Sequence, residues 1–228
     1  MATRGRPRSF DREQALRSAL NVFWARGYDG ATLEELLVAM GNLTPPSFYA
    51  AFGSKDELFR EAVALYRDEV GMATIRALEE APTARQGVEA MLRKGVDQFC
   101  SGEARGCLIV LGALNCTRAN KDAHDFLRGM RQQGPDILRR RLVRGIAEGD
   151  LPAGAPVADM VSFYTTLLHG LAVRARDGSS GQALTASVDA AMAAWDPLVG
   201  ASPKSRRSAT ERAPARPRQK SGSLRNLR

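Results

Sequence analysis

The sequence predicts an all-α fold on three observations. Apolar residues recur through most of the chain at the 3.6-residue spacing of amphipathic helices, and no segment alternates every second residue as a half-buried strand does. Ser, Thr or Asp residues precede several of these segments and glycine follows them, as at helix ends. With 44% hydrophobic and 25% charged residues, the 228-residue chain has the composition of a globular protein with one large or two small domains.

Two helices are predicted at the start of the chain. Asp11, with Gln14 three residues later, forms a capping box for the first helix, which ends at Gly27. Thr32 caps a short second helix that has two glutamates in its first turn. The pair Gly41-Asn42 ends this helix, because both residue types tolerate a positive φ.

A third, short helix is predicted from Thr44 to Phe52. Thr44 is its N-cap, and Pro45 occupies the first helical position, where the missing N–H costs nothing. Phe48 and Phe52 are four residues apart, so they share one face and dock against the preceding helices. The outward-facing residues are then Thr44, Pro45, Ser47, Tyr49 and Ala50.

The remaining helices follow from caps and breaks in the same way. Ser54 and Glu57 form a capping box that opens a long helix to residue 79, and Pro82 interrupts the pattern. Beyond Pro82 the periodicity predicts five more helices, over residues 83–102, 106–117, 121–148 (with a kink or break at Pro135), 157–177 and 182–199.

Charge is distributed unevenly along the chain. The net charge is +8, from 33 basic and 25 acidic residues. Residues 201–228 contain nine of the basic residues and one acid, so 24 of each sign remain in residues 1–200. This Arg-, Pro- and Ser-rich tail is predicted to be disordered, because it has too little apolar surface to offset its chain entropy. It can bind a polyanion without specificity or act only as a solubilising extension.

A second basic cluster precedes the first helix. Arg4, Arg6 and Arg8 alternate within residues 1–9. A flexible arm of this kind can enter a DNA minor groove, where the negative potential favours arginine; the alternative is a solvated terminus.

The order helix, short helix, tight turn, short helix is typical of a helix-turn-helix, whose second short helix lies in the major groove. Two segments are similar to the DNA-binding domain of the tetracycline-repressor (TetR) family of bacterial regulators. They are ALRSALNVFWARGYDGATLEELLVAMG, which starts at Ala15, and SFYAAFGSKDELFREAVALY, which starts at Ser47. The second contains the F-x-S-K-x-x-L-F element that is specific to the family. GLAVRARDG (170–178) with AMAAW (191–195) is similar to the dimerising helices of one subgroup.

The resemblance implies a double-stranded DNA operator as partner. By position, Thr32, Tyr49 and Lys55 contact phosphates, and Thr44, Pro45, Ser47 and Ala50 contact bases. The segment 41–44 has one residue more than the family usually has between the turn glycine and the recognition helix, which changes the expected register of base contacts by one position. The resemblance implies a repressor; activation stays open, because the sign depends on where the operator lies.

The resemblance also divides the chain into a basic arm (1–9), a DNA-binding domain (10–55), a regulatory and dimerisation domain (56–200) and a basic tail (201–228). A homodimer is expected on physical grounds too, since one recognition helix supplies too few contacts for tight specific binding. The expected interface residues are Leu167, Gly170, Leu171, Val188, Ala191 and Trp195. The candidate pocket for a small-molecule effector is lined by Met91, Phe99, Cys107, Asn115, Phe126, Met130, Phe163 and Tyr164; each has core packing as its alternative role. His169 is expected at the interface.

Other classes of protein have less support. The chain has no glycine-rich phosphate loop, HExxH, CxxC or GxSxG motif, so neither an enzyme, a catalytic residue nor a cofactor is predicted. Its three cysteines and two histidines lack the compact spacing of metal ligands, so no metal site is predicted. A thiol-based redox sensor stays an alternative, because Cys107 opens a predicted helix whose N-terminus can lower a thiol pKa. No apolar run approaches the ~18 residues of a membrane span and no signal peptide is evident, so a cytoplasmic location is expected.

Overall fold

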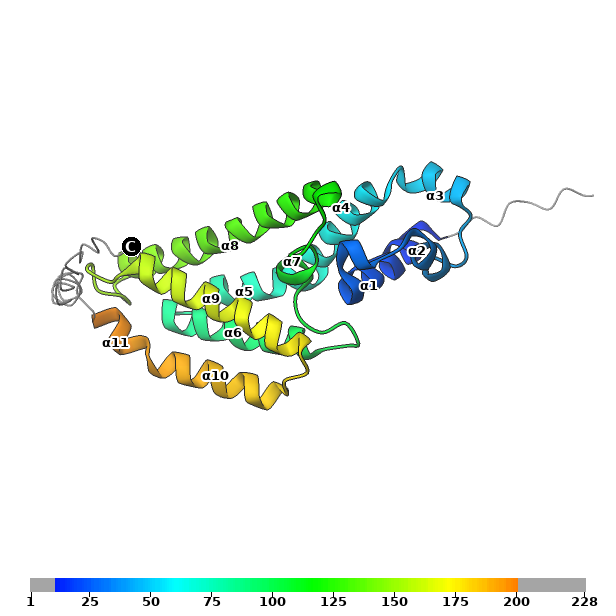
Figure 1. Cartoon of the computed structure of the whole chain (residues 1–228). Helices are drawn as coiled ribbons and strands as arrows, with labels where there is room; N and C mark the ends of the chain where they lie inside the picture. The colour runs from blue at the N-terminus through cyan, green and yellow to red at the C-terminus, as the bar shows by residue number, and fades with distance from the viewer. Residues whose placement is uncertain (1–10, 201–228) are drawn as a thin grey trace, which may run out of the picture.

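The computed structural model describes residues 11–200, and these residues contain helices and no strand. The arrangement is elongated, with α1, α2 and α3 at one end and a bundle that includes α5, α6, α8, α9 and α10 at the other (Figure 1). The helices are α1 (Arg12–Gly30), α2 (Leu33–Ala39), α3 (Pro45–Phe52), α4 (Lys55–Tyr66), α5 (Met72–Glu80), α6 (Ala84–Cys100), α7 (Leu108–Leu111), α8 (Lys121–Glu148), α9 (Val157–Arg176), α10 (Gly181–Ala193) and α11 (Trp195–Gly200). The all-α prediction is confirmed.

The predicted helix starts in the N-terminal half are confirmed. Asp11, Thr32, Thr44 and Ser54 each accept a backbone N–H of the following turn through their side-chain oxygen. Gly27 has a φ of 72° and interrupts α1, after which one further turn continues to Gly30. These ends agree with the sequence because capping depends on residues within one turn.

The long helix predicted from residue 54 to 79 is interrupted. Between α4 and α5 the segment Arg67–Gly71 is a π-helix, in which the N–H of Met72 donates to the carbonyl of Arg67, five residues earlier. The segment places one extra residue in the turn relative to an α-helix. The chain therefore passes without a break from the N-terminal helices into the bundle, but with a local change in helical register.

Three other expectations need correction. The helix predicted over residues 106–117 is only α7, Leu108–Leu111, and turns follow it. Pro135 lies inside an α8 that continues through it, so no break occurs there. The last predicted helix is divided into α10 and α11.

Two hydrophobic cores stabilise the fold. One core joins α5, α6, α8, α9 and α10, and the fully buried Leu92 and Tyr164 belong to it. The other core joins α1 to α4 with α7 and the first turns of α8. This N-terminal core thus extends beyond residue 55, since Phe59 and Tyr66 of α4 are buried in it.

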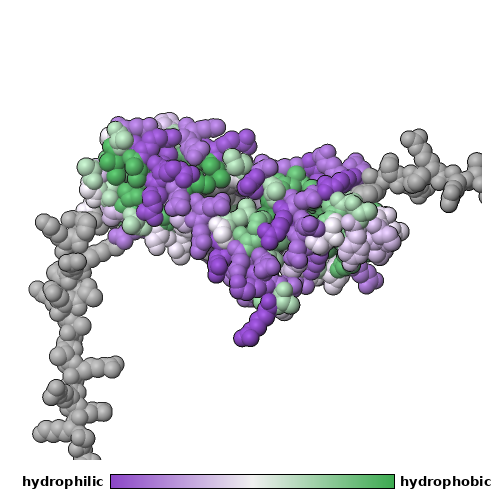
Figure 2. Space-filling view, turned by 90° about the horizontal axis from the view of Figure 1, so that it is seen from above, coloured by the Kyte–Doolittle hydropathy of each residue, from purple (hydrophilic) through white to green (hydrophobic). Residues whose placement is uncertain are grey.

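The surface is mostly hydrophilic in the view of Figure 2, with hydrophobic residues in separate areas. Among residues 11–200, no helix is both long enough and apolar enough to cross a bilayer.

Candidate nucleic-acid interface and cavity

Helix α3 presents one buried and one exposed face. Phe48 and Phe52 are buried, with exposed fractions of 0% and 3%. Tyr49 is 53% exposed and packs edge-on against the Phe48 ring, with 5.2 Å between ring centroids. The five residues expected to face outward are all exposed: Thr44, Pro45, Ser47, Tyr49 and Ala50. Tyr49 is therefore a surface residue and not a core aromatic.

Arg12 fixes α3 on α4 and was not identified from the sequence. Its guanidinium donates to the carbonyl of Ala51 and pairs with Glu61 at 2.8 Å. The same group lies 4.5 Å from the centroid of the Phe52 ring. One side chain from α1 therefore holds the end of α3 and the middle of α4 in a fixed orientation, which no local pattern in the sequence indicates.

The expected phosphate-contacting residues differ in their surroundings. The Thr32 hydroxyl is engaged in a capping box with Glu35 at the start of α2, so its contribution to an anion site is the helix N-terminus itself. The Lys55 ammonium lies 4.3 Å from the centroid of the Tyr28 ring, and burial lowers the pKa of Lys55 in spite of the nearby Asp29 and Asp56 carboxylates. Lys55 is thus a half-buried cation at the start of α4.

The end of α1 is attached by hydrogen bonds to the turns that follow α7. The N–H of Tyr28 donates to the carbonyl of Gly112 at 2.7 Å. Asp29 accepts from the N–H of Thr117 and the side-chain amide of Asn120, and these bonds outweigh burial and lower the Asp29 pKa. The turns after α7 are therefore joined directly to the N-terminal helices.

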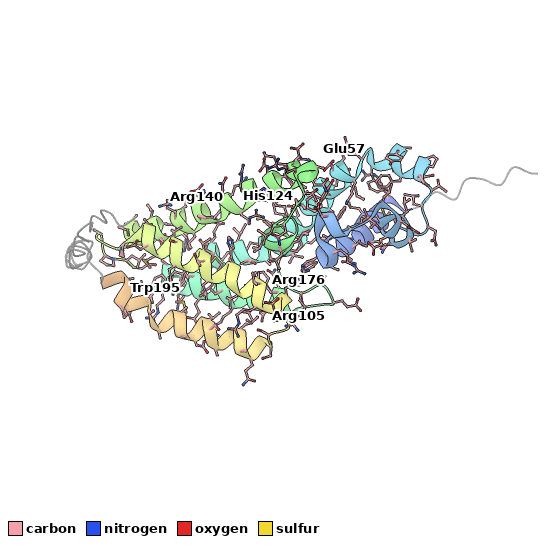
Figure 3. All side chains as sticks on the ribbon, in the orientation of Figure 1. Glu57, Arg105, His124, Arg140, Arg176 and Trp195 are labelled. Carbon is pink, nitrogen blue, oxygen red and sulfur yellow. The ribbon has the colours of Figure 1, made fainter. Side chains whose placement is uncertain are left out.

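Arg176 makes a second connection, from the last turn of α9 (Figure 3). Its guanidinium donates to the carbonyls of Trp24, Ala25 and Arg105 at 2.6–3.0 Å. The Trp24 indole N–H donates to the carbonyl of Gly106. The α1 carbonyls just before Gly27 thus accept hydrogen bonds from a side chain of α9.

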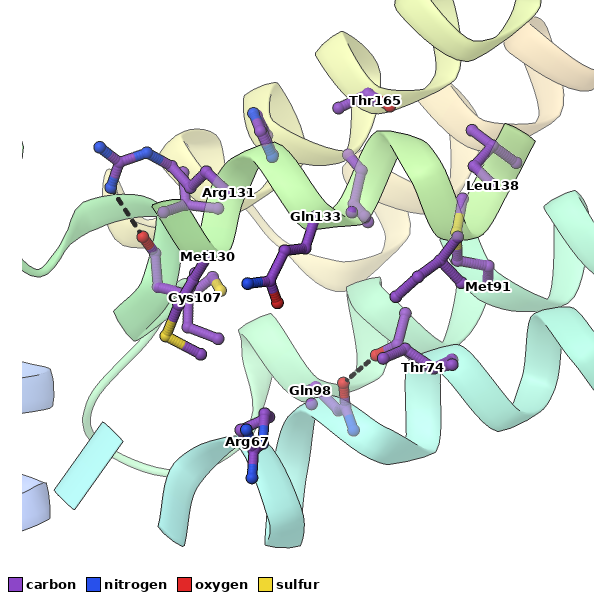
Figure 4. Close-up of a pocket in the computed structure, with 18 of the residues that line it drawn as sticks. Arg67, Thr74, Met91, Gln98, Cys107, Met130, Arg131, Gln133, Leu138 and Thr165 are labelled. Carbon is purple, nitrogen blue, oxygen red and sulfur yellow. Dashed lines mark hydrogen bonds between the residues drawn. The ribbon is translucent and has the colours of Figure 1, made fainter. Parts of the chain in front are cut away.

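A cavity of about 190 Å³ lies between α5, α6, α8 and α9 and reaches the end of α4. Most of its wall is apolar, with Leu78, Val110 and Ile137 among the lining residues. Polar side chains also line it, from several helices (Figure 4): Arg67, Thr74, Gln98, Arg131, Gln133, Thr165 and His169. Part of the wall comes from the π segment and α5, which continue the α4 helix of the N-terminal core.

The eight candidate pocket residues do not lie together. Met91, Phe99, Cys107 and Met130 line the cavity. Asn115 is exposed, and Phe126 packs against Phe59 of the N-terminal core. Phe163 is on the surface, and Tyr164 is fully buried against Trp195. Apolar periodicity identifies a buried face but not which buried atoms border a void, so Gln98, Thr74 and Gln133 were missed.

His169 lines the cavity and is half-buried, and its expected place at the interface stays a prediction. Burial, followed by the charge of Arg131, lowers the pKa of His169 below its usual 6.5. The folded state therefore binds fewer protons at this group than the unfolded chain does. The stability that depends on neutral His169 is fully present above pH 6.5 and is lost as the pH falls through the folded-state pKa.

We predict that His169→Gln makes the free energy of unfolding less dependent on pH below 6.5. The measurement is urea unfolding of both proteins between pH 7.5 and 5. The difference between their free energies of unfolding should shrink or change sign as the pH falls towards 5. A constant difference across the range contradicts a lowered His169 pKa.

Cys107 is partly buried and borders the cavity. Burial raises the pKa of its thiol, although a hydrogen bond with Tyr66 opposes that effect. Burial likewise raises the pKa of Cys116, to about 11. A raised pKa disfavours the thiolate that oxidation requires, so the structure gives the redox alternative no support.

Four of the six expected interface residues are core residues of one subunit. Leu171, Val188, Ala191 and Trp195 are at most 6% exposed. Their side chains fill the space between α6, α9 and α10, so they cannot touch a partner. Leu167 and Gly170 do lie on the outer face of α9, with the exposed Phe163 and Val173. The interface expectation for the four buried residues is therefore corrected, and that for Leu167 and Gly170 stays a prediction.

Two sets of expectations lie outside the described residues: the arginine arm (Arg4, Arg6 and Arg8) and the basic tail (201–228). Within residues 11–200, no group of three or more His, Cys, Asp and Glu side chains is placed to hold a metal ion.

The exposed short helix α3, docked on α1 and α4 and followed by a helical domain with an apolar cavity, defines a helix-turn-helix regulatory protein. Comparison with known proteins identifies the class more narrowly. The family profile "Bacterial regulatory proteins, tetR family" matches residues 15–62. Two curated relatives from Escherichia coli (strain K12) are HTH-type transcriptional repressors: ComR (28% identity; 86% of this chain, 94% of ComR) and BdcR (30% identity; 83% of this chain, 90% of BdcR).

The solved structures include a closer relative. A cysteine mutant of the TetR family transcriptional regulator CifR, complexed with 26-bp double-strand operator DNA, is 46% identical and has a TM-score of 0.80. The alignment covers 83% of this chain and 100% of that one. The chain belongs to the TetR family, and it is a DNA-binding transcriptional regulator rather than a member of an enzyme family.

Proposed function

We propose that the protein is a homodimeric repressor that binds a twofold operator through α3 and is released when a small molecule occupies the cavity. The exposed face of α3 is the main support, because its polar and small residues point to solvent while both phenylalanines are buried. Ala50 and Pro45 offer apolar contact to thymine methyl groups, and Ser47 and Thr44 offer hydroxyls. Shape and deformability of the DNA then contribute a larger share of specificity.

The phosphate contacts are assigned to Tyr49, Lys55 and the N-terminus of α2 at Thr32. Tyr49 is exposed beside the outward face of α3, and Lys55 begins the next helix. The arginine arm, Arg4, Arg6 and Arg8, is proposed to add minor-groove contacts. Such contacts fix the position of the protein on the duplex without distinguishing bases.

A second copy of the chain is proposed to pack on the outer faces of α9 and α10. Phe163 and Val173 are about 40% exposed on α9, and α10 exposes alanines at 183, 186, 190 and 193. Two helices per subunit with small outward residues allow close helix packing across a twofold axis. Two recognition helices then contact two half-sites.

The connection between cavity and DNA is proposed to run through the α4–π–α5 helix. Its C-terminal part borders the cavity, and its N-terminal part is buried in the core that supports α3. An effector that favours a different orientation of α4 shifts the population towards dimers whose recognition helices no longer match the operator spacing.

Lys55→Ala tests the phosphate assignment. We expect weaker operator binding, by a similar factor for specific and unrelated DNA, and a salt slope smaller by about 1 in log–log units. The measurement is a salt titration of binding by fluorescence anisotropy. Glu79→Ala, which changes a charge at the far end of α5, is the control. Unchanged affinity and slope contradict the assignment.

The experiment that tests the function as a whole is footprinting of the full chain on the DNA upstream of its own gene. The proposal predicts protection of a palindromic site, and that Tyr49→Ala weakens it. Protection without twofold symmetry contradicts dimeric binding.

A further inference from the structure

The π segment Arg67–Gly71 lies where the DNA-binding end meets the cavity. Arg67 and Gly71 line the cavity, and α5 contributes Thr74, Ile75 and Leu78. The carbonyl of Arg67 bonds to the N–H of Met72 instead of that of Gly71, its α-helical partner. A shift of one residue in an α-helix corresponds to about 1.5 Å along the axis and about 100° around it. Relaxation of this segment therefore reorients α4 relative to α5.

Gln98 of α6 holds this segment from the opposite wall. Its side-chain nitrogen donates to the carbonyl of Val70, within the π segment, and its side-chain oxygen accepts from the Thr74 hydroxyl at 2.6 Å (Figure 4). Gln98 also lines the cavity. A single side chain thus borders the cavity and also bonds to the π segment. An amide nitrogen has two hydrogens, and Val70 takes one of them.

The wall of the cavity disfavours a cationic occupant. No Asp or Glu side chain is among the lining residues, so a cation has no counter-charge and its desolvation is uncompensated. The Arg67 guanidinium pairs with Asp68 at 2.9 Å. Arg131 donates to the carbonyl of Ile109 and is directed away from Gln98 in Figure 4. The remaining polar side chains of the wall include Thr165 and Gln133, which are neutral.

We propose that the effector is an uncharged, mainly apolar molecule with an oxygen acceptor, and that Gln98 is the positioning residue that links its binding to the π segment. The inference rests on the proposed release by a small molecule. The acceptor oxygen takes an N–H of Gln98 and draws the amide from Val70. The Val70 carbonyl loses its side-chain partner, the π segment relaxes, and α4 turns with the recognition helix. π segments inside α-helices often mark such functional sites.

The test compares three probes of equal chain length on the full-length protein: 2-octanone, octanoate and octylammonium. Calorimetry measures direct binding, and anisotropy measures affinity for the upstream DNA fragment. We expect 2-octanone to bind more tightly than either ion and, at saturation, to lower DNA affinity about 10-fold or more. If octanoate binds more tightly than 2-octanone, the proposed uncharged ligand class is wrong and an anion bound by Arg131 replaces it. Absence of 2-octanone binding overturns it as well.

The residue assignment is tested with two variants and a matched control. Gln98→Met keeps the length of the side chain without hydrogen-bonding groups, and Gln98→Glu keeps the acceptor for Thr74 but loses the donor. Both should fold, as circular dichroism would check, and both should lose the 2-octanone response. Gln133→Met, in another glutamine of the same wall, should retain the response. A wild-type response in Gln98→Glu overturns the role of Gln98.

Hydrogen exchange distinguishes the proposed role of Gln98 from a purely structural one, because a purely structural role predicts no effect of the ligand on the exchange rates. 2-Octanone should speed exchange of the amides of residues 67–74 in the wild type and leave them unchanged in Gln98→Glu. Unchanged exchange in the wild type overturns relaxation of the π segment. A failure of the proposed function is distinct: the chain then shows no specific DNA binding, while calorimetry and exchange still report on the cavity.

Discussion

Replacing Gly170 by arginine should abolish tight operator binding while leaving each subunit folded. Gly170 is exposed on α9, and a Cβ built there has no atom within 4 Å, so the subunit itself tolerates a side chain. In the proposed dimer the same position needs a close helix approach that a guanidinium side chain prevents. A monomer contacts only one half-site and loses the avidity of linked binding, so its affinity for the operator should fall about 10²–10⁴-fold.

The measurements are sedimentation velocity for the oligomeric state and anisotropy for the operator. Gly129→Arg is the matched control, since Gly129 is also a helical glycine with no atom within 4 Å of a built Cβ. It should remain dimeric and bind normally. A dimeric Gly170→Arg variant with normal affinity contradicts the proposed interface.

Asp150→Ala should lower the free energy of unfolding by about 3–5 kcal/mol, the range for breaking a buried ion pair. Arg141 is the one charged residue that is fully buried within residues 11–200, with 2% exposure. Asp150 lies 3.9 Å from its guanidinium and also accepts the N–H of Ala84 at the start of α6. The substitution leaves the Arg141 charge with only the half-exposed Glu148 nearby and removes a helix cap.

Urea unfolding followed by circular dichroism measures this effect. Asp150→Asn keeps a side-chain acceptor for Ala84 and should cost less, and Arg141→Met added to Asp150→Ala should recover part of the loss because it removes the unpaired charge. A loss below about 1 kcal/mol, or no recovery in the double variant, means that the pair is not coupled as the geometry indicates.

Local signals in the sequence were sufficient to predict most of the structure of the DNA-binding end. Caps such as Thr44 and Ser54 depend on neighbours three residues away, and the outward face of α3 follows from the spacing of Phe48 and Phe52. Contacts across the chain were not predictable in this way. Arg12 and Arg176 look like ordinary surface arginines in the sequence, although each bonds carbonyls of another element.

The regulatory half was predicted less well for a related reason. Apolar periodicity identified α9 and α10, but it cannot say whether Leu171 or Val188 faces its own core or a partner. The π segment has the same composition as an α-helix, since one extra residue in a turn leaves no compositional trace. Gln98 matters only because α6 places it beside that segment.

A salt titration of binding to the upstream DNA, comparing the full chain with residues 1–200, tests the central claim most directly. If α3 recognises an operator, a palindromic site remains preferred after deletion of the basic tail, and only the salt-dependent, non-specific part of the affinity falls. If binding disappears with residues 201–228 and no site is preferred, the affinity is electrostatic and recognition by α3 is contradicted.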